Sequence, residues 1–567
     1  MSVFPKQMDT WQETVAVVQQ YRDNSLDIDP PLSGIPLNLP SNVSEIPRKF
    51  LSAIELDITE TPPEHLLEKL ASGELSSVAV TQAFLRRAAL AQRLTNCLTE
   101  LLPRRALARA KELDDHLSQH GKPIGPLHGL PVSIKEQITL ADHPLNYSYV
   151  SWVDNVPRHS AYLIDLLETA GAVIHARTTQ PQLIMHLECA SNLYGTTVNP
   201  FNCSLTSGGS SGGEGALLAL KGSALGVGTD IGGSVRSPAA NCGVWALRPT
   251  TGRVPMLGID EDYIGQEAIR AVAGPMSTSF EGLRSFMRAV LRGRKPELKE
   301  PGLIPLGWRD DEAKSHFWSE EKGWRLKIGV MWDDGVVKPH PPVQRALREL
   351  VEALKEIDGV EIRDWEPYHH DQAWSIAASL YFPDGGADEE RELRASGEPW
   401  LPLSRWIVKD NPFCKELGMH DLWDWTAKRE QYRIKYASRW LETATGDDER
   451  GVPTGMVDVL LCPAGPGAAP PLENSKYWGY LAQWNVLDYP AAVFPVTTVD
   501  KGADKKDQSY RPRNEQDAFN HELYEPERYT DAPVGLQLVG RIYEDEKVLA
   551  ALDFISSRIQ LPLRKAT

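Results

Sequence analysis

The stretch from Ser207 to Arg236, SGGSSGGEGALLALKGSALGVGTDIGGSVR, constrains the fold more than any other part of the chain. About a third of its residues are glycine, which lets backbone approach backbone or a ligand closely but is entropically costly to order. Such a stretch is either a flexible linker or a rigid site. Linkers are polar and repetitive, whereas this one contains an apolar run, Ala216 to Leu220, and a charged pair, Asp230 and Arg236. The sequence therefore favours a rigid site that carries serines in two glycine loops.

The composition is that of a globular protein, with 41% hydrophobic and 24% charged residues in 567. Its net charge of −17 argues against nucleic acid or an anionic membrane as a partner. The N-terminus lacks the apolar segment of a signal peptide, and no apolar run reaches the roughly 18 residues of a membrane span. Six cysteines without a CxxC pair are typical of reduced thiols rather than of a metal site. We therefore expect a cytoplasmic protein.

Helical and strand patterns alternate along the chain, which predicts an α/β fold. We expect one large α/β/α unit whose mixed central sheet is covered by helices on both faces. The strand patterns lie at 130–135, 172–176, 326–331, 360–364, 457–462, 491–496 and 534–539. The helical patterns lie at 1–24, 63–94, 107–117, 160–170 and 343–357. The polar residues 500–529 are expected to form a surface loop.

We expect four segments within this unit. Residues 1–62 form a helical extension and a proline-rich connector, and residues 63–299 form the core with the glycine loops. Residues 300–445 hold 11 of the 16 tryptophans, and residues 446–567 return to the central sheet. An aromatic-rich lobe is most often hydrophobic core, but one laid over a glycine-rich site would supply apolar pocket walls.

A serine hydroxyl is a weak nucleophile unless a base takes its proton. The pattern Gly208-x-Ser210-x-Gly212 formally matches a nucleophile elbow, which requires a buried strand before it and a later acid and histidine. Residues 199–204 make a poor buried strand. The later histidines lie in charged or turn contexts; they are His340, His369, His370, His420 and His521. The Ser-His-Asp hypothesis is therefore weak, although the residues alone leave it open.

A lysine can serve as the base if burial lowers its pKa enough to leave it uncharged. Lys135 ends a short apolar run and could point inwards from the end of a strand. Taken alone, a solvated lysine at a strand terminus is the simpler interpretation.

Three motifs together resemble the amidase signature family: GLPVSIK at 129–135, GGSSGGEG at 208–215 and GTDIGGSVRSPA at 228–239. Other segments, such as GPLHG at 125–129 and KPHPP at 338–342, are similar to fungal acetamidases and general amidases. The resemblance implies a Ser–cis-Ser–Lys triad with Ser234 as nucleophile, Ser210 as bridging serine in a cis peptide, and Lys135 as base. It further implies an oxyanion hole and a supporting shell. The oxyanion hole is expected at the backbone N–H groups of Ile231, Gly232, Gly233 and Ser234, and the shell comprises Ser211, Thr229, Asp230 and Arg236.

The expected function is that of a serine amidohydrolase. It would cleave a small aliphatic or aryl carboxamide to acid and ammonia or amine, through an acyl-enzyme and without metal or cofactor. Two alternatives stay open: a glutaminase-type subunit of an amidotransferase, and a catalytically inactive amidase fold that serves as an interaction protein. The expected partners are a small amide and, in a homodimer, a second copy of the chain. Trp245, next to the signature, departs from the family pattern and could reshape the pocket.

Overall fold

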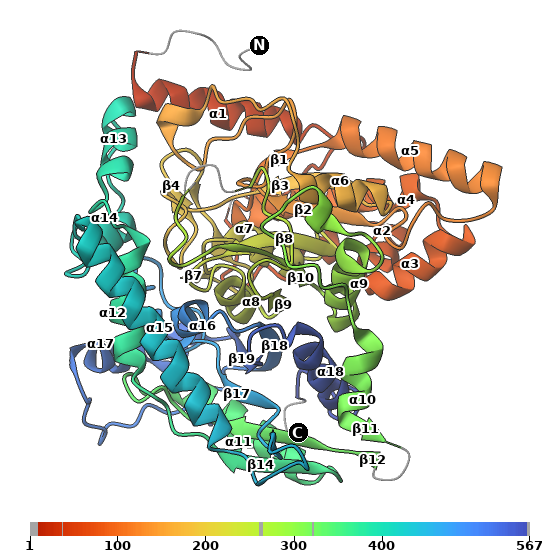
Figure 1. The fold of residues 1–567 in the computed structure, drawn as a ribbon. Coiled ribbons are helices and arrows are strands. Elements are labelled where there is room, and N and C mark those ends of the chain that lie inside the picture. The colour runs from red at the N-terminus through yellow and green to blue at the C-terminus, as the bar shows by residue number, and fades with distance from the viewer. Residues whose placement is uncertain (1–8, 37, 260–264, 320–322, 564–567) are drawn as a thin grey trace.

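The computed structural model describes residues 9–36, 38–259, 265–319 and 323–563. One mixed sheet of 11 strands runs through the molecule, with helices on both faces (Figure 1). Across the sheet the strands are β1 (Leu98–Leu101), β3 (Val173–Thr178), β2 (Pro131–Lys135), β8 (Leu225–Asp230), β10 (Val272–Ser277), β9 (Trp245–Arg248), β18 (Ala491–Thr498), β19 (Pro533–Val539), β17 (Val459–Pro463), β13 (Leu326–Val330) and β14 (Val360–Asp364). The predicted fold class is confirmed.

Parallel pairing is confined to two places in the sheet. Strands β3, β2 and β8 are parallel neighbours, and so are β17, β13 and β14. All other neighbouring pairs are antiparallel. Four two-stranded ribbons lie outside the sheet: β4 (Ala190–Ser191) with β5 (Gly195–Thr196), β6 (Val198–Asn199) with β7 (Asn202–Thr206), β11 (Trp318–Ser319) with β12 (Gly323–Trp324), and β15 (Gly446–Asp447) with β16 (Pro453–Thr454).

The helices divide at about residue 300. Before it lie α1 (Trp11–Ser25), α2 (Ala53–Glu60), α3 (Pro63–Ser72), α4 (Ser77–Thr95), α5 (Pro103–His120), α6 (Tyr162–Thr169), α7 (Gly212–Ala219), α8 (Arg236–Cys242) and α9 (Phe280–Leu291). After it lie α10 (Asp310–Phe317), α11 (Pro341–Lys355), α12 (His370–Tyr381), α13 (Ala387–Ser396), α14 (Pro402–Val408), α15 (Met419–Leu441), α16 (Gly479–Leu487), α17 (Glu515–Leu523) and α18 (Asp545–Ser556). Among the described residues, no helix has the length and apolarity that crossing a membrane requires.

Two predicted elements differ from the structure. The helical pattern at 63–94 is divided into α3 and α4, because Gly73 ends α3 in the left-handed conformation at φ +75°. The predicted surface loop at 500–529 contains α17, whose N-cap Asn514 accepts a hydrogen bond from Asp517 N–H. Its polar composition concealed this helix, because few apolar residues mark its buried side. The part of the predicted helix 1–24 that precedes residue 9 lies outside the described residues.

The sheet places the glycine-rich stretch at one edge. Strands β2 and β8 are parallel neighbours, so Lys135 at the end of β2 and the loop after Asp230 at the end of β8 lie at the same edge. Helix α7 begins directly after the first serine loop and packs on both strands.

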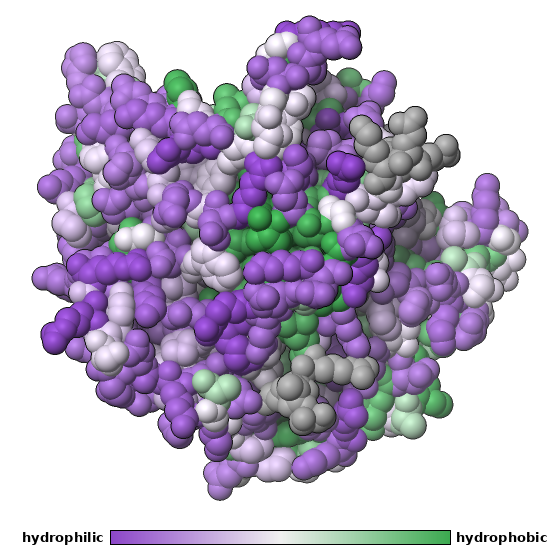
Figure 2. All heavy atoms as spheres, turned by 90° about the horizontal axis from the view of Figure 1, so that it is seen from below, coloured by the Kyte–Doolittle hydropathy of each residue, from purple (hydrophilic) through white to green (hydrophobic). Residues whose placement is uncertain are grey.

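Helices α12, α14 and α15 lie together on one side of the molecule, with α16 beside them (Figure 1). Their contacts are largely aromatic: Trp365, Tyr432, Tyr436, Trp440, Trp478 and Trp484 belong to one buried cluster. Elsewhere on the molecule the surface is mostly hydrophilic, and on the face drawn in Figure 2 apolar side chains gather near the centre.

Candidate active site

Lys135 and Ser210 meet in the buried interior. The Lys135 side chain is fully buried, and its Nζ lies 2.6 Å from Ser210 Oγ and 2.8 Å from Thr229 Oγ1. The bond between Gly209 and Ser210 is cis, as the resemblance implied. The interpretation of Lys135 as a solvated strand-end residue is therefore wrong, because both hydroxyl oxygens surround its amine away from water.

The second serine loop contacts the first through backbone. Ser234, just before α8, is 6% exposed, and its carbonyl oxygen accepts the N–H of Ser211 at 3.0 Å. The Ser211 hydroxyl in turn accepts the N–H of Thr229 at 3.3 Å. The structure thus brings Ser210, Ser211, Thr229 and Ser234 into one buried cluster.

Close packing explains the glycine of the first loop. A Cβ built at Gly209 would lie 2.4 Å from the carbonyl oxygen of His186 and 2.4 Å from the N of Glu188. No side chain fits there without moving backbone, so the peptide before Ser210 is fixed from behind.

The second loop is held by a buried ion pair. Asp230 Oδ1 lies 2.9 Å from Arg236 Nη2, and both side chains are fully buried. Asp230 also accepts the N–H groups of Gly233 and Val235 at 2.9 and 3.2 Å. Burial alone would raise the pKa of Asp230, but the Arg236 guanidinium holds it well below its usual range. The expected pairing of these two residues is confirmed.

The N–H groups of the second loop are not equivalent. The Gly233 N–H is engaged by Asp230, so it can serve a ligand only as a shared donor. Within the part of the chain that the structure describes, no hydrogen bond uses the N–H of Ile231, Gly232 or Ser234. Three N–H groups therefore stay available beside the Ser234 hydroxyl.

Glu214 is a site residue that the sequence analysis missed. Its carboxyl accepts the hydroxyls of Ser133 and Thr178 at 2.6 and 2.8 Å. Burial raises its pKa to about 8, opposed by those hydroxyls and by the charge of Lys135. Glu214 is therefore mostly protonated at neutral pH and does not place a full negative charge near Lys135. The available signal was a single acid inside an otherwise apolar helical run.

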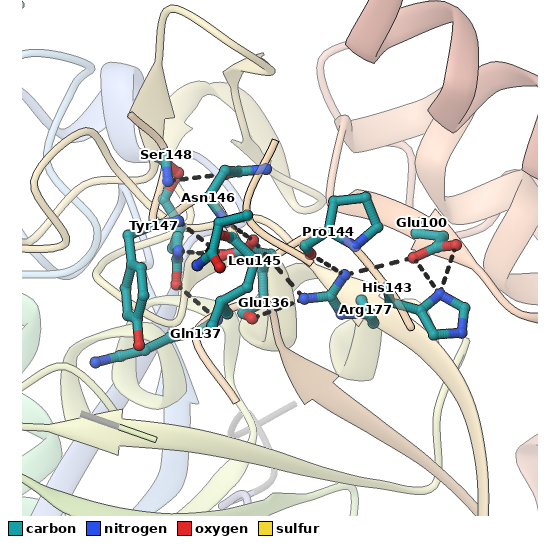
Figure 3. Close-up of polar contacts among 12 residues, drawn as sticks. Glu100, Glu136, Gln137, His143, Pro144, Leu145, Asn146, Tyr147, Ser148 and Arg177 are labelled. Atoms are coloured by element: carbon teal, nitrogen blue, oxygen red, sulfur yellow. Dashed lines mark hydrogen bonds and ion pairs between the residues drawn. The ribbon is translucent and has the colours of Figure 1, made fainter. Parts of the chain in front are cut away.

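A buried polar network fixes the turn that follows Lys135 (Figure 3). The carboxylate of Glu136 accepts the backbone N–H groups of Asn146 and Tyr147 at 2.6 and 3.3 Å. Arg177 donates to the carbonyl oxygen of Glu136 at 2.9 Å. Because these groups are buried and paired, the turn has little freedom to displace Lys135.

Two other sequence features receive a different place. The strand before Ser210, β7, belongs to a small ribbon outside the central sheet, whereas a nucleophile elbow requires a strand of that sheet. Trp245 packs in the hydrophobic core between Phe280 and Phe494, with ring centroids 6.1 and 6.2 Å away.

Comparisons with known proteins agree with this architecture. The family model described as Amidase matches residues 79–549. The chain is 40% identical to an acetamidase of Emericella nidulans, over 90% of this chain and 91% of that protein. It is 37% identical to an acetamidase of Aspergillus oryzae, over 96% and 98%. A solved structure of a fatty acid amide hydrolase superposes with a TM-score of 0.89 at 35% identity, covering 98% of this chain and 96% of that one.

The fold and these relatives together define a hydrolase that acts on amide C–N bonds. The chain belongs to the amidase signature family and is a serine amidase.

Proposed function

We propose that the chain hydrolyses a small carboxamide to acid and ammonia or amine through Ser234, Ser210 and Lys135. The observation that carries this proposal is the 2.6 Å contact between Lys135 Nζ and Ser210 Oγ in a fully buried setting. A buried amine favours its uncharged form, which can accept a proton. The amine would take the Ser210 proton while Ser210 takes the proton of Ser234.

Ser234 Oγ would then attack the amide carbonyl carbon and form a tetrahedral intermediate. The N–H groups of Ile231, Gly232 and Ser234 would stabilise its oxyanion, with Gly233 as a shared donor. The proton held by Lys135 would return through Ser210 to the leaving nitrogen, and the C–N bond would break to leave an acyl-enzyme. Water would release the acid by the same proton path in reverse. Thr229, through its contact with Lys135, and Asp230 with Arg236 would hold this geometry.

A small pocket supports a small substrate. It has a volume of about 60 Å³ and is lined in part by Leu187, Ser237 and Leu481. Leu481 covers Gly233, since a Cβ built there would lie 2.6 Å from the Leu481 side chain. The pocket therefore adjoins the second serine loop, and two of the relatives carry the name acetamidase. In a series of amides of growing acyl length, kcat/KM should fall beyond a few carbon atoms; a rise towards long chains would contradict this size limit.

The test of the mechanism is covalent labelling. A fluorophosphonate probe should label the protein once, and Ser234→Ala should abolish labelling and turnover. Ser204→Ala, at an exposed serine outside both loops, is the matched control and should retain both. Labelling that persists at full strength in Ser234→Ala would instead point to Ser210 as the nucleophile.

Further parts of the proposal concern location and assembly. A cytoplasmic protein is supported by its six free cysteines, four of them buried. A homodimer, and the division into segments 1–62, 63–299, 300–445 and 446–567, stay predictions. The glutaminase-type subunit and the inactive interaction protein are the alternatives; ammonia release from simple amides by the isolated chain would argue against both.

A further inference from the structure

Tyr381, the last residue of α12, reaches from the aromatic helices to the second serine loop. Its side chain is 2% exposed, and its hydroxyl donates to the carbonyl oxygen of Ile231 at 3.0 Å. Burial, with the nearby charge of Asp230, raises the pKa of Tyr381 above its ordinary value, so the hydroxyl keeps its proton and stays a donor.

This hydrogen bond fixes the orientation of one peptide plane. The bond between Ile231 and Gly232 is not among the cis peptides, and in a trans peptide C=O and N–H point in opposite directions. With the Ile231 carbonyl directed at Tyr381, the Gly232 N–H must point away from it. That N–H is one of the three in the loop that no described hydrogen bond uses.

The same surface closes over Gly232 itself. A Cβ built at Gly232 would lie 2.8 Å from the Tyr381 hydroxyl and 3.2 Å from the ring of Trp478. These two rings lie 6.2 Å apart and form a cover on one side of the loop. The peptide therefore cannot tilt towards that side, and loss of the hydroxyl would free it to do so.

We propose that Tyr381 is a positioning residue that aims the Gly232 N–H at the substrate oxyanion by holding the Ile231 carbonyl. The inference rests on the proposed function, in which this N–H is an oxyanion donor. Two anchors then set the loop: Asp230 holds the N–H groups of Gly233 and Val235, and Tyr381 holds the carbonyl ahead of Gly232.

The test compares Tyr381→Phe with Tyr432→Phe. Tyr432 is a matched control because its buried hydroxyl also donates to a backbone carbonyl, that of Tyr368, at 2.7 Å. Removing one oxyanion donor typically costs 100- to 1000-fold in kcat. Because Tyr381→Phe misaligns a donor and does not delete it, we expect kcat to fall about tenfold with KM changed less than about twofold. Tyr432→Phe should keep kcat.

A second measurement separates oxyanion alignment from general destabilisation. Binding of a trifluoromethyl ketone, which forms an oxyanion adduct with the serine, should weaken in Tyr381→Phe by about the same factor as kcat/KM. The matching secondary alcohol, which forms no adduct, should bind unchanged. The ratio of these two affinities does not depend on the fraction of folded protein, so it is informative even for a less stable variant.

Unchanged kcat in Tyr381→Phe, or equal weakening of ketone and alcohol, would overturn the inference. So would an equal loss of kcat in Tyr432→Phe, which would reduce Tyr381 to a stabilising contact of the aromatic helices. Failure of the proposed function looks different, because Ser234→Ala would then retain labelling or turnover.

Discussion

The two serine loops and the aromatic helices that border them are stabilised in different ways. The loops are almost wholly buried, and their glycines let backbone, hydroxyls and one ion pair pack within hydrogen-bond distance. Helices α12, α14 and α15 pack through rings such as Trp365 and Trp440, and their ion pairs lie at the surface. Proton transfer and oxyanion stabilisation need fixed dipoles in a dry site, whereas the wall of a pocket needs only apolar area.

The two regions meet at few polar contacts. Tyr381 donates to the Ile231 carbonyl, and Asn485 of α16 donates to Asp230 at 2.9 Å. The comparison therefore predicts that polar substitutions act strongly in the loops and weakly on the aromatic side.

The largest expected effect is that of Lys135→Arg. Guanidinium keeps its charge at every working pH and cannot act as the base, so kcat/KM should fall about 10³- to 10⁴-fold. Lys327→Arg in β13, where Nζ contacts the carbonyl oxygen of Gly455 at 3.1 Å, is the matched control and should keep full activity. Steady-state kinetics measure both. Near-normal turnover of Lys135→Arg would remove the lysine from the proton path.

A large loss of stability is expected for Asp230→Ala, because it leaves Arg236 buried without its carboxylate partner. Breaking a buried pair in this way costs about 3–5 kcal/mol. The exposed pair of Asp388 and Arg391 gives the contrast, and Asp388→Ala should change the free energy of unfolding by less than about 0.5 kcal/mol. Urea unfolding of both variants makes the comparison. Similar losses would show that burial does not set the difference between the two regions.

A smaller effect is expected from Glu214→Gln, and it depends on pH. The pKa of Glu214 in the folded protein, about 8, lies above its ordinary value of 4.5, so the folded state holds a proton that the unfolded chain releases. Its contribution to the free energy of unfolding is therefore largest below pH 4.5 and falls as pH rises to about 8. Between pH 5 and 7 the loss attributable to this group is about 2 kcal/mol.

Glu214→Gln should remove this loss, seen as a smaller difference between urea midpoints at pH 5 and pH 7. The control is Glu390→Gln on α13, whose pKa is lowered by its surface hydrogen bonds to Lys409 and Arg394, so its pH dependence has the opposite sign. A Glu214→Gln profile that parallels the unmodified protein would mean that the carboxyl is ionised in the fold.

The sequence by itself determined the family, the fold class and the residues of both serine loops. These follow from a long uninterrupted motif, and a motif whose glycines and serines pack against one another tolerates few other residues. The strands at 130–135 and 534–539 were readable for a similar reason, because buried strands are short apolar runs.

Only the tertiary structure decided which polar groups face each other. Glu214 is protonated because Ser133, Thr178 and Lys135 meet it from other elements, and no local pattern in the sequence records that burial. Tyr381 lies 150 residues from the carbonyl it binds, so spacing carries no trace of the contact. Trp245, beside the signature, lies in the core because sheet pairing turns its side chain away from the loops. Desolvation and hydrogen bonding depend on what surrounds a group in space, and the chain order does not contain that information.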